Sequence, residues 1–204
     1  MRRALPLRIS IFLGVLALAL PALAYEYPLS SYAIRQAYFL GAGPHSKEPE
    51  FYANYEHVLP MPRKTLPGSL VGIKTPYLQV AEYSRDTPNY NAQDAIKDFF
   101  GKPATFRAFI DVYFKPGSTP ADPSDPLDGV RVKLIQNGKE IATESAEGWP
   151  LAFVRDENTR QESAGEHIEI ACKAEKIDGS TLKIEVDTPD GEHAETEFDL
   201  ARLR

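Results

Sequence analysis

The chain has 204 residues, a formal net charge of −6 and one cysteine. A single cysteine excludes an intramolecular disulfide, so the hydrophobic core itself must stabilise the fold. The acidic balance disfavours contact with phosphate backbones, and we therefore expect no nucleic-acid partner.

The first 24 residues have the three parts of a secretory signal peptide. Three arginines lie near the N-terminus, an apolar run extends from Ile9 to Leu20, and Ala22-Leu23-Ala24 forms a small-residue cleavage site. The apolar run is shorter than the roughly 20 residues that span a bilayer, and no later stretch approaches that length. We predict cleavage after Ala24, a secreted or periplasmic location and no membrane span in the mature protein. An uncleaved N-terminal anchor is the alternative.

Residues 25–204 are enough for one mainly-β domain with its own core. The segment 25–103 is aromatic and partly helical, and the segment 104–204 is rich in predicted β-hairpins. Without the signal peptide the chain has 20 basic and 29 acidic side chains, a net charge of −9, of which −8 falls in 156–204. We assign that excess to solvent-facing positions of the last strands.

The first half is predicted to supply one or two helices. Ser30 or Ser31 can cap a helix whose apolar residues recur at helical spacing, and Gly41 is expected to end it in a left-handed conformation. Asn91–Gly101 has the strongest helical pattern, because it combines an N-cap asparagine, one apolar face and a closing glycine.

The clearest strand is Thr105–Phe114, in which every second side chain is apolar. Its other face is mixed, which predicts a central strand covered in part on both sides. Phe99 and Phe100 are expected to pack where this strand begins. Upstream, Leu70–Tyr83 has a β-branched and aromatic composition broken by Pro76, which predicts two short strands or one kinked edge strand.

Three Asx-Gly pairs separate alternating segments in the second half, at Asn137-Gly138, Asp178-Gly179 and Asp190-Gly191. Such pairs are typical of tight hairpin turns. Strands at this spacing predict an antiparallel β-sandwich, immunoglobulin-like or related, with one or two helices of the N-terminal half packed on it.

Familiar catalytic motifs are missing from the sequence. There is no Gly-x-Ser-x-Gly elbow, no His-Glu-x-x-His motif, no phosphate-binding glycine loop and no paired-cysteine metal site. Cys172 alternates with apolar residues on one predicted strand, which favours a small buried side chain over a reactive thiol. We therefore assign no catalytic residue and no cofactor. Catalytic groups assembled from distant carboxylates and histidines leave an exported hydrolase as an alternative.

Two patterns resemble metal-binding arrangements without specifying a metal site. His167 with Glu169 and His193 with Glu195 would form one patch if their strands were neighbours, but we favour solvent-facing polar positions, because nothing in the sequence fixes the strand pairing. Aspartates recur in a proline-rich loop at positions that can supply oxygen ligands to calcium, namely Asp122, Asp125 and Asp128. We assign no metal site and keep a calcium-stabilised module as an alternative.

The aromatic residues are unevenly distributed, since 17 of the 20 beyond the predicted cleavage site precede residue 115. Tyrosines near an arginine can form a platform for a sugar or a peptide. The candidate platform consists of Arg35, Tyr38, Tyr52 and Tyr55, although helical stripes of aromatic residues usually pack in a core. The sequence thus predicts an exported, non-catalytic binding or structural module whose partner is a carbohydrate or an envelope protein.

Overall fold

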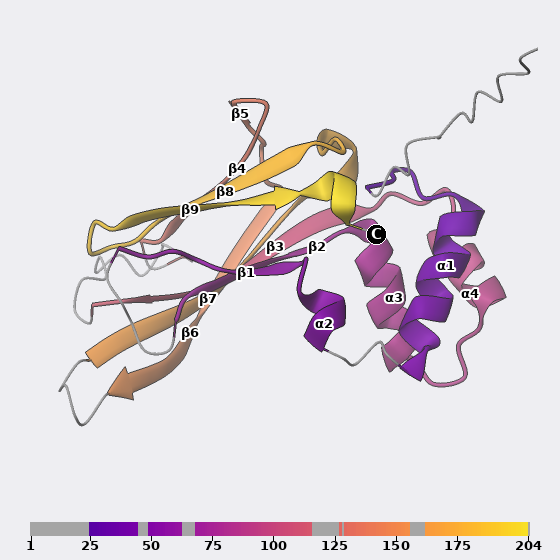
Figure 1. The fold of residues 1–204 in the computed structure, drawn as a ribbon, viewed down its shortest axis with the longest axis horizontal. Helices are drawn as coiled ribbons and strands as arrows, with labels where there is room; N and C mark the ends of the chain where they lie inside the picture. The colour runs from indigo at the N-terminus through magenta and orange to yellow at the C-terminus, as the bar shows by residue number, and fades with distance from the viewer. Residues whose placement is uncertain are drawn as a thin grey trace, which may run out of the picture.

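The structure is a computed structural model that describes residues 25–44, 49–62, 68–115, 127, 129–155 and 162–203. The predicted signal peptide and the candidate calcium aspartates lie outside the described residues. Two antiparallel sheets face each other, and the helices gather at one end of them (Figure 1). The expectation of antiparallel sheets accompanied by helices of the N-terminal half is therefore confirmed.

One sheet has five strands in the order β1-β2-β3-β7-β6 and the other has four in the order β5-β4-β8-β9. The strands of the first sheet are β1 (Glu56–Val58), β2 (Leu70–Lys74), β3 (Thr105–Phe114), β6 (Ser145–Arg155) and β7 (Glu162–Lys173). Those of the second are β4 (Arg131–Gln136), β5 (Lys139–Glu140), β8 (Thr181–Asp187) and β9 (His193–Asp199). The helices are α1 (Ser31–Ala42), α2 (Pro49–Tyr52), α3 (Pro76–Asp86) and α4 (Ala92–Phe99), with 3₁₀ turns at Ala174–Lys176 and Leu200–Arg202.

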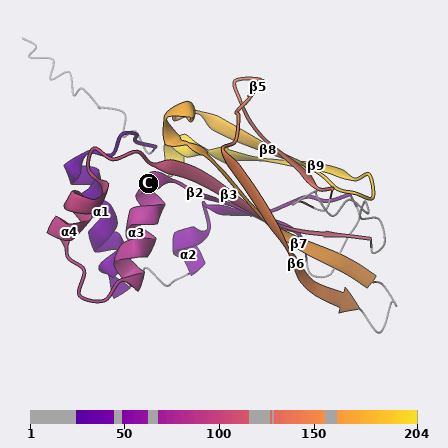
Figure 2. The same cartoon turned by 180° about the vertical axis from the view of Figure 1, so that it is seen from behind.

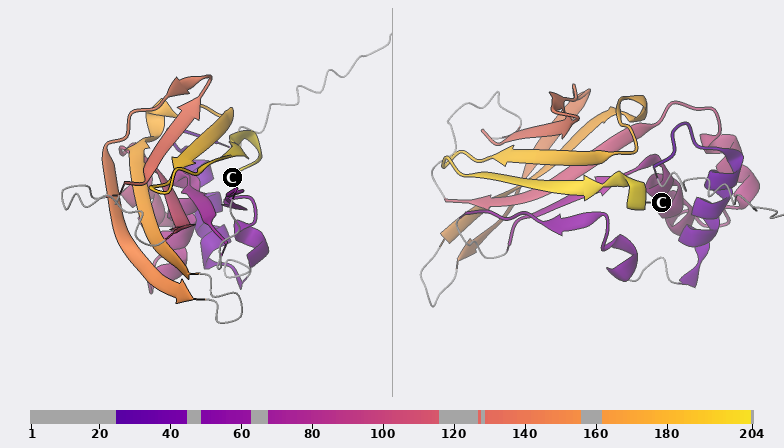
Figure 3. Two further views of the ribbon diagram at one scale, coloured as in Figure 1. Left: turned by 90° about the vertical axis from the view of Figure 1, so that its left-hand side faces the viewer. Right: turned by 45° about the horizontal axis from the view of Figure 1, so that its top comes forward.

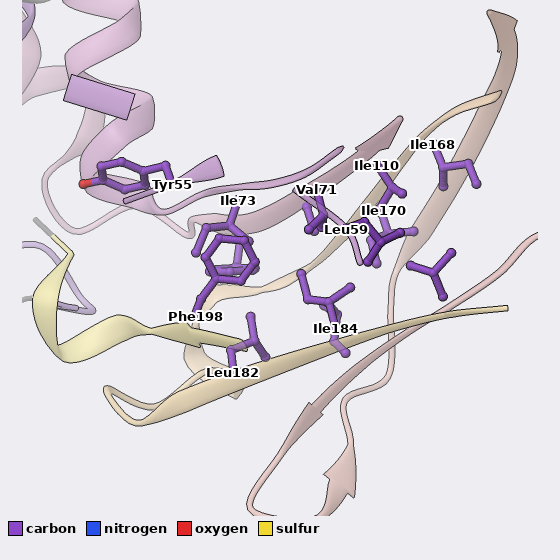
Figure 4. Packing of buried hydrophobic residues seen from close by; sticks show 14 of the residues in the cluster. Tyr55, Leu59, Val71, Ile73, Ile110, Ile168, Ile170, Leu182, Ile184 and Phe198 are labelled. Carbon is purple, nitrogen blue, oxygen red and sulfur yellow. The ribbon is translucent and has the colours of Figure 1, made fainter. Parts of the chain in front are cut away.

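The predicted central strand is confirmed as β3, which pairs with β2 on one side and β7 on the other. Its alternate side chains are buried between the sheets, namely Phe106, Ala108, Ile110, Val112 and Phe114. Figure 4 shows Ile110, Ile168 and Ile170 of the five-stranded sheet facing Leu182, Ile184 and Phe198 of the other. Burying each of these large side chains contributes about 1.5–3 kcal/mol relative to leaving it exposed.

The segment after β2 is a helix, so the prediction of a second strand there is wrong. The hydroxyl of Thr75 accepts a hydrogen bond from the backbone N–H of Leu78 at 3.2 Å, and Pro76 occupies the first turn of α3. Proline is favoured there because its missing N–H has no partner within the helix anyway. The β-branched composition was misleading because the buried residues of α3, including Val80 and Ala81, pack against α1.

The first helix is confirmed, but Gly41 does not end it. Ser30 is the N-cap and accepts a hydrogen bond from Ala33 at 3.1 Å. The helix continues to Ala42, and Gly41 is buried where α1 crosses α3, because a Cβ atom there would lie 1.9 Å from the carbonyl oxygen of Ala81. Gly41 is therefore needed for close helix packing rather than for a left-handed turn.

The last helix follows its prediction closely. The side chain of Asn91 accepts hydrogen bonds from the first turn of α4, and Gly101 has a φ of +68°. Phe99 packs edge-on against Tyr83 of α3 with ring centroids 5.8 Å apart. Phe100 is 55% exposed, so the expectation that both phenylalanines pack at the start of β3 is wrong for Phe100.

Two of the three Asx-Gly pairs form hairpin turns. Asn137 and Gly138 have φ values of 53° and 71°, which is the conformation of a type I′ turn between β4 and β5, and Gly191 has a φ of 83° between β8 and β9. Asp178-Gly179 instead connects β7 of one sheet to β8 of the other. Gly179 does not adopt the positive φ of Gly138 and Gly191, and Asp178 instead accepts a hydrogen bond from the backbone N–H of Ser180 at 2.8 Å.

Cys172 is fully buried on β7, as predicted from its apolar neighbours. Burial raises the pKa of its thiol to about 11. The thiolate is the reactive form of cysteine, so this residue is a small core side chain rather than a nucleophile.

His57 on β1 packs across the edge between the two sheets. Its ring stacks on Phe198 of β9 at 4.2 Å, with an interplanar angle of 4°, and its Nδ1 lies 3.3 Å from the hydroxyl of Thr196. Burial lowers the pKa of His57 below its ordinary value.

The lowered pKa of His57 predicts a loss of stability in acid. Below about pH 6.5, His57 binds a proton more readily in the unfolded chain than in the folded protein. The free energy of unfolding therefore falls as the pH decreases, until the pH is below the lowered pKa of His57 in the folded protein. His57→Phe keeps a flat ring on Phe198 but cannot be protonated. Thermal melts between pH 7 and pH 5 should show a larger drop for the wild type than for this variant; parallel drops would contradict the prediction.

Candidate functional site

The candidate site lies on the outer face of the five-stranded sheet, which points away from the core. The strand register places Leu70, Asp111, His167 and Trp149 in one row across β2, β3, β7 and β6. The adjacent row, in the same strand order, contains Gly72, Phe109, Glu169 and Glu147. Figure 2 shows β6 and β7 running from the centre of the molecule to the end opposite the helices.

Two aromatic rings of this outer face lie against glycines of neighbouring strands. A Cβ atom on Gly72 would meet the ring of Phe109 at 2.0 Å, and one on Gly165 would meet the ring of Tyr113 at 2.6 Å. A ring can come this close to the sheet only where the neighbouring strand has no side chain. Phe109 and Tyr113 therefore lie flat over the backbone instead of standing away from it.

His167 lies at the centre of the outer face. Its Nδ1 is 2.5 Å from Oδ1 of Asp111, the neighbouring residue on β3. The indole of Trp149 stacks on it at 4.5 Å with an angle of 28°, and the ring of Phe109 lies nearly parallel at 6.5 Å. Its buried Nε2 makes no hydrogen bond within the described residues, and Oε1 of Glu169 is 3.8 Å away.

A cavity of about 230 Å³ opens beside this histidine, between the sheet and helices α2 and α3. Its lining combines aromatic and aliphatic residues with charged ones: Tyr52, Tyr55, Glu56, Ile73, Lys74, Leu78, Glu82, Phe109, His167 and Glu169. Nζ of Lys74 is 3.2 Å from Glu82 and 5.7 Å from the ring centroid of Phe109. This volume is below the roughly 300–1,000 Å³ of pockets that enclose a whole small molecule, so the cavity suits one part of a ligand.

A second hollow of about 190 Å³ adjoins the first and shares Glu169 with it. It extends across β3, β7 and β6, where Nη1 of Arg107 is 3.9 Å from Oε2 of Glu169 and Glu147 also contributes to the lining. The two hollows lie on either side of Glu169 and give the outer face a polar and partly aromatic lining. Figure 3 shows the long β6 and β7 side by side along this face of the molecule.

The structure separates the four residues of the predicted platform. Tyr52 and Tyr55 line the cavity, although Tyr55 is only 4% exposed, and Arg85 donates a hydrogen bond to the hydroxyl of Tyr52. Tyr38 packs in the helical cluster and donates a hydrogen bond to the backbone of Tyr90 at 3.1 Å. Arg35 is exposed on α1. Tyr52 and Tyr55 thus line the cavity, whereas Arg35 and Tyr38 lie on α1 and are not part of its lining.

The sequence interpretation missed Phe109, His167 and Trp149 as one group. Each residue was visible as part of a strand, but only the register of three strands brings their rings together. One local signal was present, because Gly72 and Gly165 interrupt otherwise regular strands. A glycine inside a strand often marks close approach by another group.

The hypothesis that the two His-Glu pairs meet is wrong. His167 and Glu169 lie on β7 of one sheet, whereas His193 and Glu195 lie on β9 of the other. Both pairs alternate with buried residues of their strands, so they point away from the core on opposite sides. Within the described part of the chain, no group of three or more His, Cys, Asp or Glu side chains can hold a metal ion.

The first cavity is lined by His167 and Glu169, residue types that can act as acid or base, but its lining includes no serine, threonine or cysteine. Two hydroxyl side chains, Thr105 and Ser145, line the second hollow instead. Direct hydrolysis by an activated water remains the catalytic chemistry that such a lining permits.

Comparisons with protein-family models, with curated proteins and with solved structures find no match for this chain. Among the helices of the described residues, none combines the length and apolar character needed to cross a bilayer.

Proposed function

We propose that this protein is an exported, non-catalytic binding module that recognises a carbohydrate on the outer face of its five-stranded sheet. On this proposal the two facing sheets are an immunoglobulin-like or related sandwich that acts as a rigid support. The binding surface consists of the two hollows, with Phe109 in the lining of the first, and of the exposed indole of Trp149, which stacks on His167 outside their lining. Tyr52 contributes at its helical edge.

The observation that carries the proposal is the combination of flat rings with paired opposite charges. Sugars present apolar C–H faces that pack on aromatic rings, and hydroxyls that both donate and accept hydrogen bonds. Phe109 lies flat over Gly72, and Trp149, which is 44% exposed, stacks on His167 of the intervening strand. The pairs Lys74–Glu82 and Arg107–Glu169 offer donors and acceptors next to these rings.

Replacing Trp149 with alanine is expected to remove most of the binding. Truncating a central aromatic anchor costs about 2 kcal/mol or more, which is roughly thirtyfold in affinity. Because Trp149 is the only tryptophan in the chain, its fluorescence reports ligand contact directly in the wild type. Isothermal calorimetry on glycans selected from an array gives the affinity of each variant.

The matched controls are Tyr32→Ala and Phe100→Ala, which remove exposed rings of the helical end. Both should bind as the wild type does. Unchanged affinity of Trp149→Ala for a glycan that the wild type binds would contradict the proposal. Retention of an envelope protein in place of any glycan would favour a protein partner.

A second candidate, an exported hydrolase, is favoured by one observation. Asp111 holds His167 at 2.5 Å, and Glu169 lies beside the same cavity, so an acid and a base adjoin the proposed ligand. Glycans that bind the wild type should be recovered intact if the module is non-catalytic. Soluble sugar released by the wild type but not by Glu169→Gln would favour the hydrolase.

A further inference from the structure

We infer that Asp111 and His167 are positioning residues that hold the indole of Trp149 in its binding orientation. The inference rests on the proposed function, because it explains how the exposed ring of that site is kept in place. Neither residue needs to touch the ligand for this role.

Trp149 lies on an edge strand, β6, and so has a neighbouring strand on one side only, at β7. Its side chain is 44% exposed, and an exposed ring that is free to change rotamer loses conformational entropy when a ligand orders it. A binding surface therefore gains affinity if the protein orders the indole beforehand.

The contact that orders the indole is the stack on His167. The two rings are 4.5 Å apart and inclined by 28°, and the register places Trp149 directly opposite His167. Phe109 approaches the imidazole from β3, on the other side of β7, at an angle of 9°. The imidazole of His167 thus lies between the ring of Phe109, which covers Gly72, and the exposed indole of Trp149.

The imidazole is in turn oriented by Asp111. Nδ1 of His167 lies 2.5 Å from Oδ1 of Asp111, which is hydrogen-bonding distance. Within the described residues, Nε2 has no hydrogen-bond partner. Asp111 is therefore the hydrogen-bonding group that sets the plane of the imidazole, and through it the plane of the indole.

The test compares Asp111→Ala, His167→Ala and His167→Phe. An aromatic pair is worth about 0.5–1.5 kcal/mol, so losing the stack should weaken glycan binding about two- to tenfold. His167→Ala should show this loss and Asp111→Ala a part of it. His167→Phe should restore binding, because phenylalanine retains a flat ring between Phe109 and Trp149.

A ligand-independent measurement separates positioning from general damage. The near-ultraviolet circular dichroism and the fluorescence anisotropy of Trp149 should report a more mobile indole in His167→Ala and Asp111→Ala, and the wild-type state in His167→Phe. Glu197→Ala, which removes an exposed carboxylate from the other sheet, is the control for lost charge. Melting temperatures show whether each variant is folded under the conditions used.

Wild-type Trp149 signals in folded His167→Ala would overturn the inference. A wild type that binds no glycan would overturn the proposed carbohydrate function, whereas the spectroscopic comparison would still decide whether Asp111 and His167 order the indole. Full binding by His167→Ala, in a wild type that does bind glycan, would overturn the inference alone.

Discussion

Replacing Phe198 with alanine is expected to cost about 3–5 kcal/mol of the free energy of unfolding. The side chain is fully buried between the two sheets and also supports the stacked ring of His57 from β1. Its removal leaves a cavity in the core between the two sheets, and such cavities are closed only in part by relaxation of the surroundings. Because small domains are stable by only about 5–15 kcal/mol, this one change should shift denaturation strongly.

Urea unfolding followed by circular dichroism measures the effect. Phe100→Ala is the matched control, because it deletes the same ring from a position that is 55% exposed, and it should change stability by no more than about 0.5 kcal/mol. Similar losses in the two variants would show that Phe198 does not link the sheets as described.

Replacing Gly41 with alanine is expected to destabilise the protein by about 1–3 kcal/mol, although alanine is the better helix former. The added methyl group would lie 1.9 Å from the backbone oxygen of Ala81. Backbone atoms cannot turn aside as a flexible side chain can, so α1 and α3 must separate. The buried residues that the two helices share, including Ile34 and Val80, would then lose contact.

Gly68→Ala is the control for this second prediction. A Cβ atom there meets nothing within 4 Å, so the change should be neutral or slightly stabilising, since it restricts the unfolded chain. Thermal melts of both variants give the comparison. A stabilised Gly41→Ala variant would mean that the helices can approach differently from the arrangement described.

The helical end and the outer face of the five-stranded sheet are structurally coupled. Helix α3 begins two residues after β2 ends, and Lys74 at the end of β2 pairs with Glu82 on α3. The helices thus form one wall of the cavity whose floor is the sheet. A change that displaces α3, as Gly41→Ala should, is therefore expected to disturb the cavity as well as the stability.

Local signals predicted the elements whose causes lie within a few residues. Alternating burial in Thr105–Phe114, the caps at Ser30 and Asn91, and the type I′ turn at Asn137-Gly138 depend on neighbouring residues alone. The strand prediction for Leu70–Tyr83 is wrong beyond Lys74, because Thr75 caps a helix and Pro76 occupies its first turn. The prediction that Gly41 ends its helix is wrong because the contact that requires a glycine there is with Ala81 of another helix, α3.

The sequence by itself determined the secondary structure of most strands, the buried state of Cys172 and the lack of any disulfide. Only the tertiary structure decided that Asp178-Gly179 joins two sheets, that the two His-Glu pairs lie apart, and that Phe109, His167 and Trp149 form one surface. The physical reason is the range of the interactions involved. Side-chain alternation and turn conformation are set by local backbone geometry, whereas strand order and register are set by the burial of residues that are distant in the chain.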